Sequence, residues 1–116
     1  MPDTIEIQLK KGVLGLCVLA LLSGRDNYAY EIAARLADDI GMGEGTIYPL
    51  MRRMQSDGLV ETYLVESPSG PSRKYYRLTD AGHRAFEAQK TEWTGFARAV
   101  EGILNAPTPS DTGETA

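Results

Sequence analysis

The chain has 116 residues and a mass of 12.7 kDa, which is enough for one domain with a modest hydrophobic core. Its net charge of -4 and isoelectric point near 4.9 argue against indiscriminate binding to polyanions, so a nucleic-acid function would depend on local charge. No apolar run reaches membrane-spanning length, and the single cysteine excludes an internal disulfide. We therefore expect a cytoplasmic protein without a membrane partner.

Positive charge is concentrated in the middle of the sequence. Residues 52–84 carry six Lys or Arg against four Asp or Glu, whereas residues 1–51 carry four against seven and residues 85–116 carry two against five. The middle segment is therefore the only net-positive one, and it begins at the paired arginines Arg52 and Arg53.

Three helices are predicted in the first half of the chain, before residue 58. Ile5 to Leu22 is apolar enough to be covered on most sides, and Ser23-Gly24 is expected to end this helix. Asp26 or Asn27 is suited to cap a second helix, which Gly41 would end. A third helix, with an apolar stripe of Ile47, Leu50, Met51 and Met54, would stop at Asp57-Gly58. The short link between helices two and three is typical of a helix-turn-helix.

A hairpin and a long helix complete the predicted fold. Leu59 to Glu66 and Arg73 to Leu78 have the composition of strands, with Ser67 to Ser72 as a mobile tip. Thr79 is expected to cap a last helix that ends near Leu104. We predict a mainly α protein with a small β-hairpin: a winged helix-turn-helix domain over residues 1–78, a dimerisation helix over 79–105 and a disordered tail over 106–116.

The outward side of the third helix is small at its beginning and cationic further along. At 100° per residue it is centred on Gly45, Pro49, Arg52 and Ser56, with Tyr48 and Arg53 flanking. The arginines can bind guanine edges or phosphates, and the Tyr48 phenol can reach a phosphate. A surface helix with solvated arginines remains an alternative. The presence of Pro49 in the helix is explained if Gly45 or Thr46 is the N-cap, because proline is tolerated in the first turn. If the helix begins earlier, Pro49 is expected to kink it.

The second arm of the hairpin adds cations beside this helix. Arg73 and Lys74 follow directly on the predicted tip, which is where a wing presents positive charge to a neighbouring groove or backbone. Arg77 lies further along the same arm and is expected to pair with Glu61 or Glu66.

Four segments together resemble the PadR family of bacterial transcriptional regulators. They are Leu14 to Leu22, YAYEIAARL at Tyr28 to Leu36, GTIYPLMRRMQSDGLV at Gly45 to Val60, and SGPSRKYYRLTDAGH at Ser69 to His83. The combination of GTIYPLMRRM with a following RKYYRLT is specific. A single helix after the wing is similar to the compact subgroup of the family. Ala29 replaces a glycine that relatives often have, which is a mild departure.

The resemblance implies a homodimeric repressor that reads an inverted-repeat operator in double-stranded DNA, with the third helix in the major groove and the wing beside it. By position, the recognition helix would use Thr46, Tyr48, Pro49 and Arg52, and the wing would use Arg73 and Lys74. In several relatives small aromatic or cationic compounds release the DNA. No cofactor is expected.

The last helix carries a heptad pattern of apolar residues. Phe86, Trp93 and Val100 recur every seven residues, interleaved with Gln89, Phe96 and Ile103. A small domain cannot cover such a seam alone, so we predict a dimer interface of Phe86, Trp93, Phe96, Val100 and Ile103. The family resemblance also suggests that Trp93 stacks on a planar aromatic effector, with Leu16, Phe96 and Val100 lining the site; the alternative is that Trp93 only fills the interface.

Enzymatic and metal chemistry are not expected. The one histidine, His83, and the one cysteine, Cys17, are distant in sequence, whereas a metal site needs three or four ligands. The acidic residues lack a nucleophile or acid partner, and the glycine-rich GMGEG at Gly41 to Gly45 lacks the lysine of a phosphate loop. The competing hypothesis is a dimeric protein-interaction module that uses the winged-helix scaffold without binding specific DNA.

Overall fold

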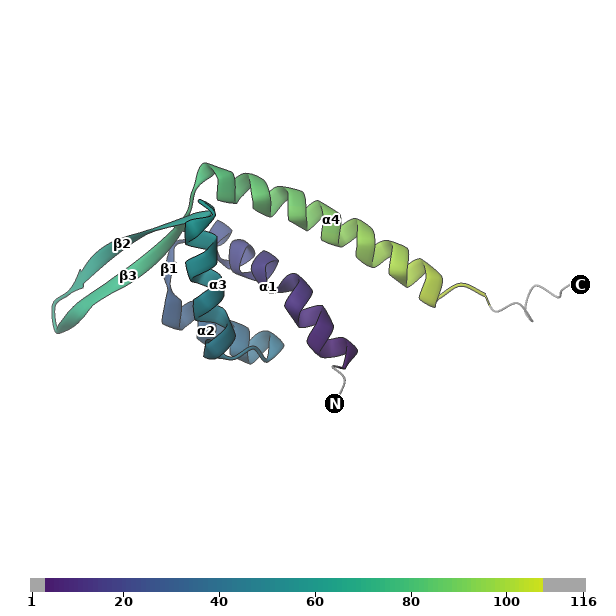
Figure 1. Ribbon diagram of the computed structural model, residues 1–116, viewed down its shortest axis with the longest axis horizontal. Helices are drawn as coiled ribbons and strands as arrows, with labels where there is room; N and C mark the ends of the chain where they lie inside the picture. Colours follow the sequence, from purple (N-terminus) through teal and green to yellow (C-terminus); the bar gives the residue numbers. More distant parts are fainter. Residues whose placement is uncertain (1–3, 108–116) are drawn as a thin grey trace, which may run out of the picture.

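The computed structural model describes residues 4–107 and has the mainly α winged-helix architecture that the sequence predicts (Figure 1). In chain order its elements are α1 (Ile5–Gly24), β1 (Asn27–Tyr28), α2 (Ala29–Ile40), α3 (Glu44–Ser56), β2 (Val60–Ser67), β3 (Gly70–Leu78) and α4 (Asp80–Leu104). Most of the predicted tail, residues 108–116, lies outside the described residues, as do residues 1–3.

The core lies where the second half of α1 meets α2, α3 and the base of the sheet. Val18, Ile32 and Ile47 are fully buried there, and Met51, Val60 and Tyr76 join them. The first half of α1 is different, because Ile5 is 73% exposed and Leu9 is 49% exposed. The expectation that the first helix is covered on most sides is therefore wrong for this half within one protomer.

The predicted helix ends at Gly24, Gly41 and Gly58 are confirmed, but the predicted cap of α2 is wrong. Gly41 and Gly58 have φ angles of 71° and 77°, which glycine adopts most readily. The N-cap of α2 is Tyr28, and it makes no capping bond with its side chain. The Asn27 amide instead donates to Glu31 at 3.0 Å, so it ties down the first turn by another route.

The sheet has three antiparallel strands in the order β1-β3-β2, one more than the predicted hairpin. β1 pairs Asn27 with Tyr76 and Tyr28 with Tyr75. Pairing of β2 with β3 continues to Ser67 and Gly70, so the predicted six-residue tip shrinks to a turn at Pro68-Ser69. Pro71 is tolerated in β3 because β1 does not reach the tip, which leaves an open edge there.

The long last helix begins and ends as predicted. The Thr79 hydroxyl accepts from the Gly82 amide at 3.0 Å and donates to the Gly58 carbonyl at 2.6 Å, which joins the helix start to the turn after α3. From there α4 runs past α1 and extends beyond the rest of the domain (Figure 1). No helix within residues 4–107 has the length and hydropathy needed to cross a membrane.

Candidate nucleic-acid interface

The helix α3 separates a buried apolar side from an exposed cationic side. Ile47 and Met51 are at most 1% exposed, and Met54 is 4% exposed. The residues on the opposite face are exposed to solvent: Gly45, Thr46, Pro49, Arg52 and Arg53. Burial of the first set fixes the rotation of the helix, because turning it would expose that apolar stripe. The outward face is therefore the one that its periodicity predicts.

The start of α3 differs from the favoured expectation. The helix begins at Glu44 with Gly43 as its N-cap, and the Gly43 carbonyl accepts from the amides of Thr46 at 3.1 Å and Ile47 at 3.3 Å. Pro49 is then the sixth helical residue, which places it beyond the first turn. A first-turn position does not explain this proline. Since proline has no N–H, the Gly45 carbonyl lacks its usual donor four residues on.

Arg52 and Arg53 point to different sides of the outward face, since consecutive helical residues are about 100° apart. Arg53 lines a groove between α3 and α1. Tyr48 lies on the other flank and packs partly against the core. Burial, and next the Glu44 carboxylate, raise the pKa of Tyr48 above its usual value. Among residues 4–107 no salt bridge involves Arg52 or Arg53.

The wing presents Arg73 and Lys74 on opposite faces of β3. The Arg73 guanidinium lies over the Tyr28 ring, 4.6 Å from its centroid, so a cation–π contact holds this arginine beside the start of α2. Lys74 is exposed and is paired in register with Leu64. Arg77 binds Glu61 at 3.0 Å, which resolves the choice between Glu61 and Glu66.

A row of tyrosines attaches the wing to the helix-turn-helix. Tyr75 on β3 lies between Tyr28 and Tyr63, with ring centroids 5.5 and 5.8 Å away. The Tyr63 hydroxyl donates to Asp26 at 2.6 Å, and this bond raises the pKa of Tyr63. Sequence reasoning did not find this row, because β1 has only two residues and shows no alternating pattern. The repeated tyrosines at 28, 30, 63 and 75 were the available signal.

Within residues 4–107, the predicted seam of α4 packs against the core only at its beginning, although Val100 is also half-buried. Phe86 packs against the core, whereas Trp93, Phe96 and Ile103 are 43%, 63% and 77% exposed in one protomer. Leu16, Trp93 and Phe96 line one cleft of about 380 Å³ between α1 and α4. Val100 does not line this cleft, so the structure brings together three of the four residues predicted for an effector.

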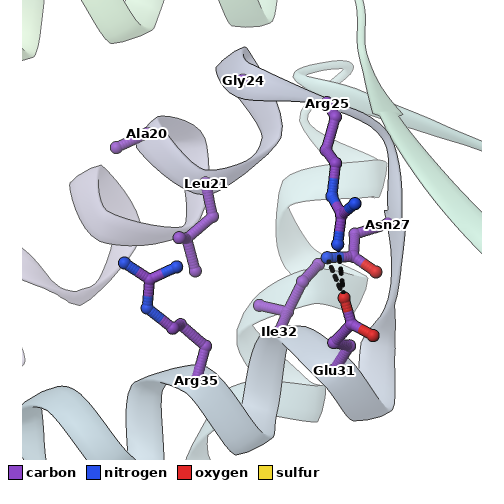
Figure 2. Close-up of a pocket in the computed structure, with 8 residues that line it drawn as sticks. All are labelled: Ala20, Leu21, Gly24, Arg25, Asn27, Glu31, Ile32 and Arg35. Atoms are coloured by element: carbon purple, nitrogen blue, oxygen red, sulfur yellow. Dashed lines mark hydrogen bonds and ion pairs between the residues drawn. The ribbon is translucent and has the colours of Figure 1, made fainter.

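Another cleft, of about 420 Å³, lies between the end of α1 and the start of α2 (Figure 2). Its arginines are engaged with carboxylates: Arg25 binds Glu31 at 2.8 Å, and Arg35 binds Asp39. Asn27 also reaches Glu31, so this cleft is tied together by internal ion pairs and hydrogen bonds. Its cations are therefore less suited to DNA than those of α3.

Comparison with known protein families gives one matching family model over the helix-turn-helix and wing. The model of the transcriptional regulator PadR-like family matches residues 18–88. A protein of Lysinibacillus sphaericus described as uncharacterized is 29% identical over 101 residues, which are 84% of this chain and 93% of that protein.

Solved structures give the same fold. A PadR-like transcriptional regulator of Bacillus cereus is 38% identical with a TM-score of 0.79, covering 86% of this chain and 99% of that chain. A Streptococcus transcriptional regulator is 34% identical with a TM-score of 0.77, covering 89% and 100%. A PadR family transcriptional regulator of Eggerthella lenta is 34% identical with a TM-score of 0.76, covering 87% and 89%.

Proposed function

Because the chain belongs to the PadR-like family of transcriptional regulators, we propose that it is a repressor that binds an inverted-repeat DNA operator as a homodimer. Residues 1–78 form the DNA-binding unit, and residues 79–105 form the dimerisation helix. The proposed DNA contacts are Thr46, Tyr48, Pro49, Arg52, Arg53, Arg73 and Lys74.

The observation that supports DNA binding most strongly is the outward face of α3. Its two arginines are exposed and have no salt bridge within residues 4–107, in a protein whose net charge is -4. Exposed guanidinium groups on a helix of this size fit the major groove, where arginine binds the O6 and N7 atoms of guanine. Arg73 and Lys74 supply further positive charge on the adjacent wing.

An electrophoretic shift with the DNA upstream of the protein's own gene tests this proposal. We expect a retarded band that survives excess random duplex, because base contacts favour the operator over other sequences. A band removed equally by random duplex, or no band at low salt, would reject specific binding.

The assigned recognition face is tested by replacing Arg52. Arg52→Ala is expected to weaken operator binding by about 1 to 3 kcal/mol, the value of a good arginine–guanine contact. Arg98→Ala is the matched control, since Arg98 is also exposed but lies on α4. If Arg52→Ala and Tyr48→Ala both bind like the wild type, the face is wrongly assigned.

Exposed apolar residues on α4 support the homodimer. Phe96, Ile103 and Leu104 are 63%, 77% and 74% exposed, and large apolar patches on a soluble chain usually mark an interface. A second copy of the chain is the simplest cover. It would also place two α3 helices about one DNA turn apart, as a palindrome requires.

The cleft beside Trp93 supports an aromatic effector. A planar aromatic compound that stacks on the indole ring would contact Leu16 and Phe96 in the same cleft. We expect such a compound to quench tryptophan fluorescence and to release the DNA. Unchanged affinity for the compound in a dimeric Trp93→Phe variant, measured by calorimetry, would reject this site.

Salt dependence separates this function from that of a protein-interaction module. Binding to DNA should weaken steeply with added salt because counterions are released from the phosphates. Association through an apolar protein interface should change little over the same range. A salt-insensitive complex with a protein, in a chain that does not retard its upstream DNA, would favour the module.

A further inference from the structure

A groove between α1 and α3 adjoins the proposed recognition face. Four residues of α1 and five of α3 line a volume of about 600 Å³: Lys11, Gly12, Leu14, Gly15, Gly45, Thr46, Pro49, Leu50 and Arg53. Thr46, Pro49 and Arg53 belong to the proposed DNA contacts. The groove therefore continues that surface onto α1, which lies outside the helix-turn-helix.

The charge of this groove differs from that of three other clefts within residues 4–107. Among residues 4–107, its lining includes Lys11 and Arg53 and no acidic residue. The other three clefts each contain at least one carboxylate, from Glu31, from Glu92, or from Glu6 and Asp39. In a protein of net charge -4, this lining suits a polyanion.

Three glycines inside helices open the groove. Gly12 and Gly15 lie within α1, and Gly45 lies near the start of α3; a Cβ added at any of them would meet no atom within 4 Å. Glycine inside a helix lowers stability by about 0.5 to 1 kcal/mol relative to alanine. Because these three glycines line the groove, their helix backbones are accessible to a chain that enters it.

We propose that this groove seats one sugar–phosphate strand of the duplex whose major groove receives α3. Lys11 and Arg53 contact phosphates from the two sides of the groove, and Gly15 and Gly45 allow the strand to come close. Arg53 then positions the protein, whereas Arg52 reads a base. This inference rests on the proposed DNA-binding function and adds α1 to the interface.

The test measures operator affinity against salt concentration, with a scrambled duplex of equal length beside the operator. Lys11→Ala and Arg53→Ala should each reduce the slope of log Kobs against log salt by about 0.9, the value for one phosphate contact on duplex DNA. Each should weaken both duplexes by the same factor. Arg52→Ala should instead reduce the preference for the operator, and Arg98→Ala should change neither quantity.

Filling the groove gives a second measurement. Gly15→Ala is expected to keep or raise the melting temperature, because alanine favours the helix and meets no neighbour, yet to weaken binding to both duplexes by roughly tenfold. Gly95→Ala, an equally open glycine on α4, should leave DNA affinity unchanged.

Three results overturn the inference. If the wild type prefers the operator but the Lys11→Ala and Arg53→Ala slopes equal its own, the groove holds no phosphate while the proposed function stands. If these variants change the dimer mass and not the slope, the groove is occupied by the second subunit. If the wild type shows no preference for any operator, the inference and the proposed function fail together.

Discussion

The beginning and the end of α4 have opposite environments, although the heptad pattern of apolar residues continues from Phe86, which packs against the core, to Ile103. At the beginning, Gly82 is buried against the Leu59 backbone, and the Thr79 hydroxyl bonds to the Gly82 amide of α4 and to the Gly58 carbonyl. At the end, Ile103 and Leu104 are more than 70% exposed. Within one protomer the start of α4 is therefore packed and hydrogen-bonded, whereas its end is exposed to solvent. The same sequence pattern therefore serves internal packing at one end and, we propose, association at the other.

The largest effect on stability is expected at the packed end. A Cβ at Gly82 would lie 2.1 Å from the Leu59 carbonyl oxygen, which is backbone and cannot rotate away. Gly82→Ala should therefore lower the free energy of unfolding by roughly 3 kcal/mol, the upper part of the usual range for overpacking. Urea denaturation measures this loss. An unchanged midpoint would mean that α4 is not docked against Leu59.

At the exposed end the expected effect is on association. Ile103→Ser removes, from each of the two protomers, an apolar side chain whose burial in an interface is worth about 1.5 to 3 kcal/mol, so the dimer dissociation constant should rise roughly 100-fold or more. Sedimentation equilibrium measures it, with Arg98→Ser as the matched control on the opposite side of the helix. Equal dissociation constants for Ile103→Ser and the wild type would remove the end of α4 from the interface.

Loss of the helix cap is expected to have a smaller effect. Thr79→Ala removes the bond to the Gly82 amide and should lower the free energy of unfolding by about 1 kcal/mol. Thr79→Ser keeps the hydroxyl and should stay near the wild type. The same urea titration compares the two; an equal loss in both would show that the methyl group, not the hydroxyl, matters.

The smallest change is a gain in stability at Gly95. No atom lies within 4 Å of a Cβ added there, so Gly95→Ala should raise the free energy of unfolding by about 0.5 to 1 kcal/mol through helix propensity. A loss of stability in thermal unfolding would show that this side of α4 is also covered.

Long periodic elements could be predicted from the sequence, and short contact-dependent ones could not. The stripe of Ile47, Met51 and Met54 fixed α3 because three buried positions repeat at helical spacing. β1 could not be predicted because two residues are too few to show the alternation of a strand. They form a strand only because they pair with β3. The prediction of the α2 cap was wrong for a related reason. Asp26 accepts a hydrogen bond from the Tyr63 hydroxyl, which is 37 residues away in sequence.

In the candidate site, too, features within one helix could be predicted, whereas contacts between separate segments could not. Helical geometry identified the outward arginines of α3, because it depends only on residues within one helix. The contact of Arg73 with Tyr28 and the groove that joins Arg53 to Lys11 depend on how separate segments pack. Pro49 was misplaced because the Gly43 backbone, without a side-chain bond, begins the helix before the expected cap.

Hydroxyl-radical footprinting of the wild-type protein on its upstream DNA tests the central claim most directly, because it reports DNA contact and two-fold assembly together. We predict two protected tracts related by a two-fold centre and about one helical turn, or a multiple of it, apart. A single protected tract, or uniform cleavage at protein concentrations that retard the DNA, would contradict a dimer that reads its operator with paired α3 helices.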